Sequence, residues 1–202
     1  MKYLKLFFAI LLFSGFFKYS HAQNVELTSG DASILKGQPT IQVTFNYDKM
    51  KIGEFTEELY IKQKKSEFRK PADADKFIAK WKADFKDSHQ PKFIEQFNFN
   101  TKKLKLQAVT DDETAKYTMI VNTDLIDPGF SGKGIARETF INLTVNIVES
   151  ANPEDILASI LVEKVVGVGE TTVEMKDQQA RITNAYGNAG LRLAKLLVRL
   201  CK

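Results

Sequence analysis

The alternation of apolar and polar residues between Tyr117 and Val166 predicts the sheet of this protein. In the segment 141–147 the alternation is strict, with the apolar set at Ile141, Leu143, Val145 and Ile147. A period of two is the pattern of a strand that buries one face and exposes the other. The segment 117–125 alternates in a similar way and is rich in β-branched and aromatic residues, which favour strands. Its expected core-facing residues are Tyr117, Met119, Val121 and Leu125.

The residues between these two strands predict a loop. The segment from Asp127 to Gly134 contains one proline and three glycines, which cannot continue a strand ladder. The flanking strands are therefore expected to pair as a hairpin. The third apolar run, 156–166, has two interpretations: a helix capped by Asn152 with Pro153 in its first turn, or a strand that ends at Gly167. We favour the strand, because residues 136–149 need a hairpin partner nearby.

A further strand is predicted at Thr40 to Tyr47, where every second residue is apolar. Some 70 residues separate this segment from the predicted sheet. We expect it to join that sheet, because a lone strand would leave its backbone groups unpaired. The preceding residues 23–38 are polar with weak periodicity, and 32–37 suit a short strand or a turn.

Two helices are predicted between this strand and the sheet. The first covers residues 54–69, where Ile52, Phe55 and Leu59 recur at helical spacing. The second opens at Pro71 and places its apolar residues on one stripe, at Phe77, Ile78, Trp81 and Phe85. Pro91 interrupts the pattern, so a break or kink is expected near His89. The apolar face then continues through Phe93, Ile94 and Phe97.

The C-terminal segment is the longest predicted helix and begins at Asp177. Its apolar residues follow a spacing of three and four, at Ile182, Ala185, Tyr186, Ala189, Leu193, Leu196, Leu197 and Leu200. A polar stripe is expected opposite, at Arg181, Asn184, Asn188, Arg192, Lys195 and Arg199. Gly187 and Gly190 lower the helix propensity, and we expect them to allow the helix to approach a strand closely.

These elements predict an α+β fold. We expect a two-layer sandwich in which a mainly antiparallel sheet of about four strands is packed by the long C-terminal helix. Residues 23–202 would form a single domain, with 54–105 as a basic helical insertion between the first strand and the others. A chain of this length is sufficient for one hydrophobic core.

Residues 1–22 have the features of a secretory signal peptide. Lys2 and Lys5 precede a 12-residue apolar stretch, Leu6 to Phe17, and cleavage is expected after Ala22. A membrane span needs about 20 apolar residues, so we expect export to the periplasm or the exterior. A lipid anchor is not expected, because no cysteine lies near the cut. No later segment is long and apolar enough to cross a bilayer.

The charge is distributed unevenly along the chain. Without the three signal-peptide lysines, 26 basic residues nearly balance 25 acidic ones, so net charge gives no reason to expect nucleic-acid binding. The segment 62–105 has 13 basic and six acidic residues. This excess predicts a basic face for an envelope protein or an anionic envelope component, with Lys76, Lys80, Lys82 and Lys86 as candidate residues. The alternative is a solvated helix surface whose aromatic residues form core.

The residue types of the chain offer little catalytic chemistry. After cleavage, His89 is the only histidine and Cys201 the only cysteine, so a histidine–cysteine metal cluster cannot form. A Gly-x-Ser-x-Gly elbow is absent, and the glycine-rich segment 129–134 lacks the spacing of a phosphate-binding loop. We therefore expect no catalytic residue, metal or cofactor. A single cysteine in an exported chain also favours a bacterial protein.

The C-terminal half resembles a known class of domains. The features on which this resemblance rests are, in chain order, the strand 117–125, the corner Pro128-Gly129-Phe130, the strand 141–147, a third apolar run, a glycine pair and a helix with Ala185-Tyr186 and Leu193-Ala194. This order is similar to uncharacterised exported and lipoprotein domains of bacterial envelopes, including the N-terminal domain of the Tol-system periplasmic protein. The resemblance covers residues 116–202 and implies an envelope location without catalytic residues. The chain departs from it in lacking a lipid-attachment cysteine, and the segment 54–105 has no counterpart.

The sequence thus favours a non-catalytic, exported binding or envelope-assembly component that acts through its surface. One alternative is a carrier of a small apolar ligand, with a pocket between the sheet and the aromatic helical block at Trp81, Phe85 and Phe97. A hydrolase whose carboxylates the sequence does not single out is the second alternative.

Overall fold

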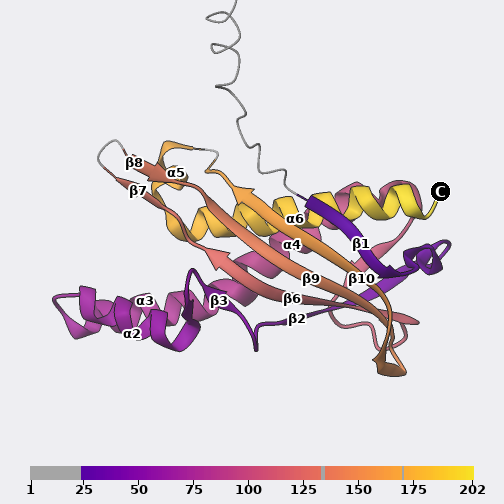
Figure 1. Ribbon diagram of the computed structural model, residues 1–202, viewed down its shortest axis with the longest axis horizontal. Coiled ribbons are helices and arrows are strands. Elements are labelled where there is room, and N and C mark those ends of the chain that lie inside the picture. The colour runs from indigo at the N-terminus through magenta and orange to yellow at the C-terminus, as the bar shows by residue number, and fades with distance from the viewer. Residues whose placement is uncertain (1–23, 133–134, 170) are drawn as a thin grey trace, which may run out of the picture.

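The computed structural model describes residues 24–132, 135–169 and 171–202 (Figure 1). The predicted signal peptide and its cleavage site lie outside the described residues. Within those ranges, no helix has the length and apolar character needed to cross a membrane.

An open, mixed sheet forms one layer of the fold. Its path is β1-β10-β9-β6-β2-β5, and β3 and β4 attach beside β6. The strands are β1 (Asn24–Gly30), β2 (Thr40–Asn46), β3 (Lys51–Ile52), β4 (Phe55–Thr56), β5 (Gln107–Val109), β6 (Tyr117–Asp127), β9 (Thr139–Glu149) and β10 (Asn152–Gly167). Strands β1, β10, β9 and β6 are antiparallel, whereas β2 runs parallel to both β6 and β5.

The expectation of about four mainly antiparallel strands is therefore wrong: the sheet has eight strands and is mixed. The missed strands β3, β4 and β5 have only two or three residues, too few to show a period of two. The missed β1 is a polar edge strand. The strand at 40–46 does join the sheet, and its parallel pairing with β6 follows from the long helical connection between them.

The three long strands confirm the predicted core of the sheet. Strands β6 and β9 pair antiparallel, and 156–166 belongs to β10, so its helical interpretation is wrong. The predicted loop is a corner at Pro128-Gly129 followed by a small ribbon of β7 (Phe130–Gly132) and β8 (Ile135–Arg137). A bulge between Thr123 and Leu125 changes the inward set, so that Ile126 is buried and Leu125 only half-buried.

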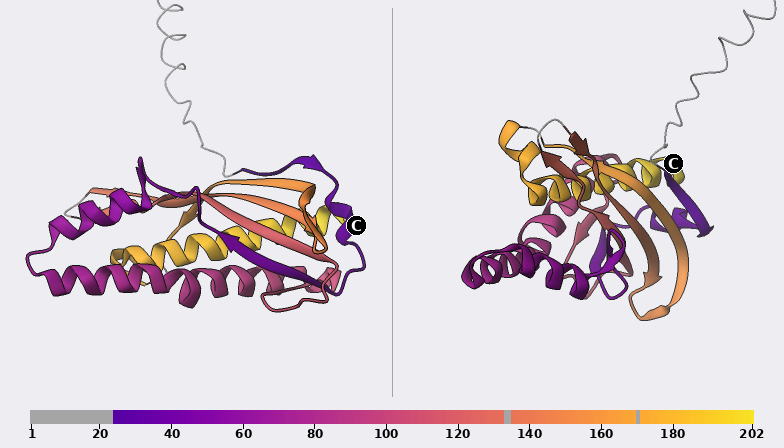
Figure 2. Two further views of the ribbon diagram at one scale, coloured as in Figure 1. Left: turned by 90° about the horizontal axis from the view of Figure 1, so that it is seen from below. Right: turned by 60° about the vertical axis from the view of Figure 1, so that its left-hand side comes forward.

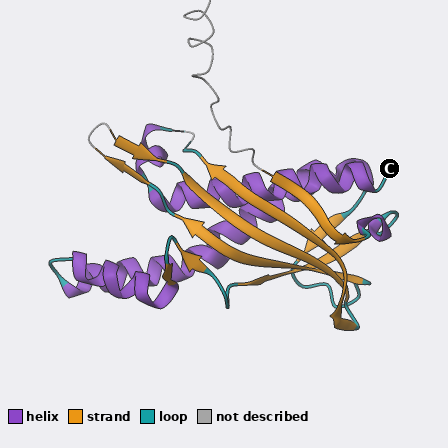
Figure 3. Ribbon diagram, in the orientation of Figure 1, coloured by secondary structure: helices purple, strands orange, loops and turns teal. Residues whose placement is uncertain are grey.

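The helices form the second layer (Figures 2 and 3). Seen from below, α4 (Gln90–Thr101) and α6 (Gln178–Leu200) lie side by side under one sheet face. The hairpin of α2 (Glu57–Glu67) and α3 (Pro71–Asp84) extends to one end of the molecule. Short helical pieces are Ala32–Leu35, Lys102–Leu104 and α5 (Thr172–Lys176). A C-terminal helix on a sheet confirms the coarse two-layer prediction.

The first predicted helix starts later than expected. Ile52 is buried in β3, whereas Phe55 in β4 and Leu59 in α2 are exposed. A tight β3–β4 turn with Gly53 at φ 60° precedes the helix, and Thr56 caps it by accepting a hydrogen bond from the Leu59 N–H. The three apolar residues therefore belong to three elements and do not form a stripe.

The predicted break near His89 is a π-helical turn, Phe85–His89, that joins α3 to α4. The Gln90 N–H donates to the Phe85 carbonyl, five residues earlier. Pro91 lies in the first turn of α4 and has no N–H to donate. A local π turn accommodates such an irregularity without ending the helix.

The two glycines of α6 approach a helix, not a strand as predicted. A Cβ at Gly190 would lie 2.2 Å from the Phe93 carbonyl oxygen of α4. A Cβ at Gly187 would instead meet the Lys92 side chain, with Cγ at 3.0 Å. Gly190 therefore sets the distance between α4 and α6, while Gly187 faces side chains that are free to move.

This difference predicts that Gly190→Ala destabilises the protein by about 1–3 kcal/mol or more, because α6 must move away from the α4 backbone. Gly187→Ala is the matched control: relief of the glycine helix penalty, about 1 kcal/mol, offsets its contact with Lys92. Urea unfolding monitored by circular dichroism measures both changes. Equal destabilisation by the two substitutions would contradict the close helix contact.

Candidate functional site

The four lysines of the predicted basic face lie on α3 and the π turn, and all are exposed. A helix advances about 100° per residue, so Lys80 and Lys82 project about 160° apart around the axis. The Lys80 Nζ is 2.7 Å from the Asp84 carboxylate, which neutralises part of its charge. Lys76 and Lys80 thus lie on one flank of the helix, and Lys82 and Lys86 on another.

The three aromatic residues of the predicted apolar pocket are core residues. Trp81 and Phe97 have no exposed surface, and Phe85 is buried. Trp81 packs against Phe85 at 5.6 Å between ring centroids and donates from Nε1 to Glu57 at 2.8 Å. Phe97 instead stacks on Phe93. Because these rings are buried within the core, they give no support to the carrier hypothesis.

His89 and Cys201 are far apart. The His89 Nδ1 is 2.9 Å from the Thr183 Oγ1 in the first half of α6, whereas Cys201 follows the last turn of that helix. Thr183 and Cys201 are 18 residues apart, or about 27 Å along the axis. A histidine–cysteine nucleophile pair is therefore excluded. Among the described residues, no group of three or more His, Cys, Asp or Glu side chains is placed to hold a metal.

His89 is a neutral core residue. Its ring stacks on Tyr186 with centroids 5.2 Å apart, and its Nε2 has no hydrogen-bond partner among the residues described. Burial, reinforced by the charge of Lys80, lowers the pKa of His89 from 6.5 to about 4; the neighbouring Gln179 acts in the opposite direction, although its amide makes no direct bond to the ring. The imidazole is therefore uncharged at neutral pH.

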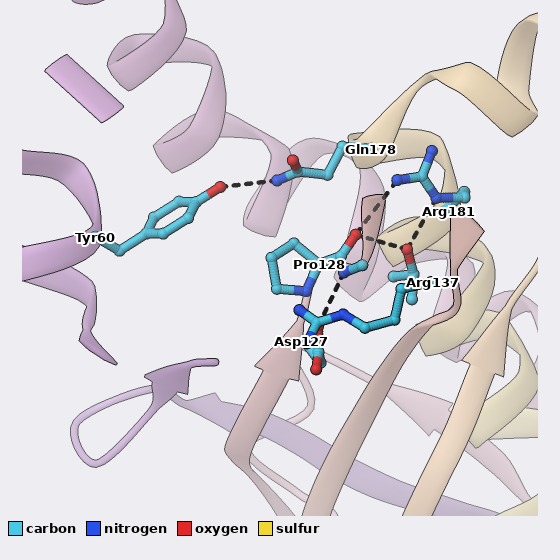
Figure 4. A network of polar contacts seen from close by, with 8 residues as sticks. Tyr60, Asp127, Pro128, Arg137, Gln178 and Arg181 are labelled. Atoms are coloured by element: carbon cyan, nitrogen blue, oxygen red, sulfur yellow. Dashed lines mark hydrogen bonds and ion pairs between the residues drawn. The ribbon is translucent and has the colours of Figure 1, made fainter. Parts of the chain in front are cut away.

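An open hollow of about 460 Å³ lies where α2, the β3–β4 turn, the β6–β7 corner and the start of α6 meet; we call it the corner cleft. Its lining comes from three distant parts of the chain, at 52–64, 125–137 and Gln178. Figure 4 shows Tyr60 on one side, Asp127, Pro128 and Arg137 on the other, and Gln178 between them.

A buried arginine holds one wall of the corner cleft in place. Arg181 of α6 donates from Nε to the Thr139 Oγ1 at 2.9 Å and from Nη2 to the Pro128 carbonyl at 3.3 Å (Figure 4). It also donates from Nη1 to the Met175 carbonyl at 2.7 Å. The Thr139 hydroxyl donates to the same Pro128 carbonyl at 2.8 Å. Because unpaired buried polar groups are costly, these bonds fix the corner against β9, α5 and α6.

The corner itself requires a glycine and a carboxylate. Gly129 has φ 54°, and a Cβ there would lie 2.3 Å from the Arg137 carbonyl oxygen. The Asp127 Oδ1 accepts from the Gly129 N–H at 3.0 Å and from the Arg137 Nη2 at 2.9 Å. The sharp turn therefore directs Arg137 to the mouth of the cleft.

Two exposed phenylalanines border the corner cleft. Phe55, which lines it, is 41% exposed, and Phe130, directly after the corner, is 48% exposed. The Arg137 guanidinium lies over the Phe130 ring, 5.9 Å from its centroid. Apolar surface is thus present on both the α2 side and the β7 side of the cleft.

The chemistry of the corner cleft is suited to recognition. The Gln178 Nε2 donates to the Tyr60 hydroxyl at 2.8 Å. Burial raises the pKa of Tyr60, against a smaller opposing effect of the Gln178 bond, so the phenol keeps its proton at neutral pH. The other polar side chains at the cleft include the Gln63 amide, Lys64 and Arg137. Amides and cations of this kind bind ligands by hydrogen bonds and charge.

Sequence periodicity placed Arg181, Asn184 and Asn188 on a polar stripe opposite the apolar face of α6, but all three contact other parts of the fold. Arg181 is buried, and the two asparagines donate to the Val168 and Val166 carbonyls at the end of β10. Helical periodicity gives the angle of a side chain but not the neighbours it meets. The Asp127-Pro128-Gly129 corner was the only local signal of this site.

The network predicts that Arg181→Met lowers the free energy of unfolding by about 2–4 kcal/mol, because buried carbonyl groups lose their donor. Arg137→Met is the matched control: its side chain is 59% exposed, so loss of the Asp127 pair costs about 1 kcal/mol or less. Urea unfolding measures both variants, and the Gly129 amide resonance reports the corner. A similar cost for both substitutions would show that the Arg181 network adds little rigidity.

Because the pKa of His89 is lower in the native protein than in the unfolded chain, the unfolded chain binds a proton over a pH range in which the native protein does not. The free energy of unfolding is therefore predicted to fall as the pH is lowered from about 6.5 to about 4. The full effect is about 3 kcal/mol. Urea midpoints of wild type and His89→Phe at pH 7 and pH 5 test this, since phenylalanine preserves the ring packing. An identical pH slope in the two proteins would rule out His89 as the titrating group.

Comparison with known proteins assigns no family. No protein-family model matches the chain, and no curated protein sequence is significantly similar to it. Among solved structures, a PelC dodecamer from Paraburkholderia phytofirmans matches with a TM-score of 0.39 and 10% identity over 83% of this chain and 97% of that chain. A leucine-to-methionine variant of that dodecamer matches with a TM-score of 0.35 and 10% identity, over 84% and 98%. Similarity at this level establishes neither common ancestry nor a shared function.

Proposed function

We propose that this protein is a non-catalytic, exported component of a bacterial envelope assembly, and that a partner protein docks at the corner cleft. The apolar N-terminal segment supports export, with cleavage after Ala22. The role is binding or envelope assembly through surface contacts, without turnover of a substrate.

The observation that carries the proposal is the combination of an open cleft with exposed aromatic residues on both of its borders. Large exposed apolar side chains beside a concave surface mark interaction sites. Phenylalanine and arginine are also enriched in protein–protein interfaces relative to the rest of the surface. Phe55, Phe130 and Arg137 supply these types at the mouth of the cleft.

The rigidity of the wall supports the same conclusion. The Arg181 network and the Tyr60–Gln178 bond fix the groups that a partner would contact, and a preorganised surface loses less entropy on binding. The side-chain amide of Gln63 makes no hydrogen bond to another described residue. It is therefore available to the main chain of a partner segment.

The proposal predicts that a photocrosslinking amino acid at Phe55 or Phe130 captures the same envelope protein in intact cells. Phe99 is the matched control, because it is 63% exposed and lies near the distant end of α4. The adduct should decrease several-fold when Phe55→Ala is combined with a crosslinker at Phe130, because an aromatic contact of the interface is lost.

Two results would contradict docking at the corner cleft. The first is equal labelling from Phe99 and from the cleft positions, or no adduct from either cleft position. The second is loss of the adduct in Lys82→Glu/Lys86→Glu while the Phe55 substitution has no effect. That outcome would show that the partner binds the flank of α3 that carries Lys82 and Lys86.

A further inference from the structure

Helices α4 and α6 leave one face of the sheet uncovered (Figures 1 and 2). The central strands of the sheet carry a group of asparagines on this face. We call it the amide array; its members are Asn46 of β2, Asn122 of β6, and Asn142 and Asn146 of β9. All four are half-buried. Their strand neighbours are buried or packed against the core, so the asparagines project to the side opposite the helices.

Strand propensity does not account for these residues. Asparagine is depleted in strands, where β-branched and aromatic residues are preferred. Strands β6 and β9 are interior strands, paired on both sides. Threonine would keep such a face wet at lower cost. The concentration of asparagine on one face therefore indicates a role for the amide group itself.

Each of three asparagines is held by one hydrogen bond. The Asn122 Nδ2 donates to the Thr144 carbonyl at 3.1 Å. The Asn146 Oδ1 accepts from the Ser159 hydroxyl at 2.9 Å, and the Asn142 Oδ1 accepts from the Lys164 N–H at 2.8 Å. These bonds fix the side-chain orientations and distinguish the amide nitrogen from the oxygen.

The same bonds leave the second half of each amide unused. The Asn122 Oδ1, the Asn142 Nδ2 and the Asn146 Nδ2 have no hydrogen-bond partner within the described ranges. Beside them, Asp124 accepts from the Thr144 hydroxyl through Oδ2 at 2.7 Å and keeps Oδ1 free. The face therefore presents oriented donors and acceptors whose positions are fixed before a ligand arrives.

The strand register places these groups close together. Asn122 pairs across the strands with Thr144 on one side and Asn46 on the other. Directly opposed residues have Cβ atoms about 4.5–5.5 Å apart, and same-face residues of one strand are about 6.7 Å apart. Half-buried Ile120 and Leu161 lie between the polar groups on the same face.

We propose that the amide array binds a neutral glycan chain. A sugar hydroxyl donates and accepts at once, which matches a surface where free amide nitrogens stand beside free amide and carboxylate oxygens. The C–H faces of sugar rings would contact Ile120 and Leu161. Asp124 disfavours a polyanion, including nucleic acid, because its carboxylate repels phosphate.

A solvated outer face would use the same residues without binding anything. It accounts for the Asn46 Oδ1 that accepts from the Asp48 N–H and for the first hydrogen bond of the other three asparagines, but it leaves the free halves of Asn122, Asn142 and Asn146 without a use. The glycan site also stands apart from the corner cleft, so it does not depend on the proposed protein partner.

The test is a nuclear magnetic resonance titration of the full folded domain with cellohexaose, maltohexaose, laminarihexaose and chitohexaose, each to about 5 mM, the range of weak binding. At least one should shift the side-chain NH₂ signals of the array while leaving the Gly129 amide in place. Asn122→Ser/Asn146→Ser should weaken that binding at least about tenfold, because two oriented hydrogen bonds are lost.

Asn100→Ala is the matched control: it removes an amide on α4, where its Nδ2 donates to the Gln96 carbonyl, and should leave the binding unchanged. The direct shifts in the wild type keep the test valid even if the double variant folds poorly. Absence of array shifts with all four sugars would overturn the proposal, and so would binding that the double variant retains in full.

Discussion

Close packing of α6 on α4 is the constraint on which the rest of the structure depends. Gly190 lets the α6 backbone meet the backbone of Phe93, so both helices fit under the same sheet face. The inner residues of β2, β6, β9 and β10 then share one core with the two helices. Because neither helix crosses to the other side, neither covers the outer face, where the amide array stays half-exposed among the described residues.

The same helix pair determines where the corner cleft forms. The π turn joins the end of α3 to the start of α4 without a break in the helix. The α2–α3 hairpin therefore extends beyond the sheet. The first turns of α6 meet this hairpin through the Tyr60–Gln178 bond and meet the β6–β7 corner through Arg181. The cleft is the space left between these contacts. Its wall is stabilised by buried polar groups, for which loss of a partner is costly.

The two proposed surfaces use different chemistry because they lie on different structural elements. The cleft combines aromatic borders with a fixed wall and the free Gln63 amide, and it suits an irregular protein surface. The array is built on regular strands, where fixed spacing and preset hydrogen bonds suit a repeating ligand. His89 belongs to neither surface. Its burial beneath the first half of α6 links the core to pH through the cost of charging a buried ring.

The sequence by itself determined the long strands β2, β6 and β9, the helix α6 with its start at Asp177, and the coarse two-layer arrangement, because side-chain periodicity over seven or more residues is a local property. For 156–166 it favoured a strand over a helix, and the structure decided for the strand β10. It did not determine the eight-stranded mixed pairing, the bulge that exchanges Leu125 for Ile126, or the cleft. Strands of two or three residues show no period, and the cleft joins residues more than 100 positions apart. Only the tertiary structure decided that Arg181 is buried and that Trp81, Phe85 and Phe97 fill the core, because burial depends on which surfaces meet after folding.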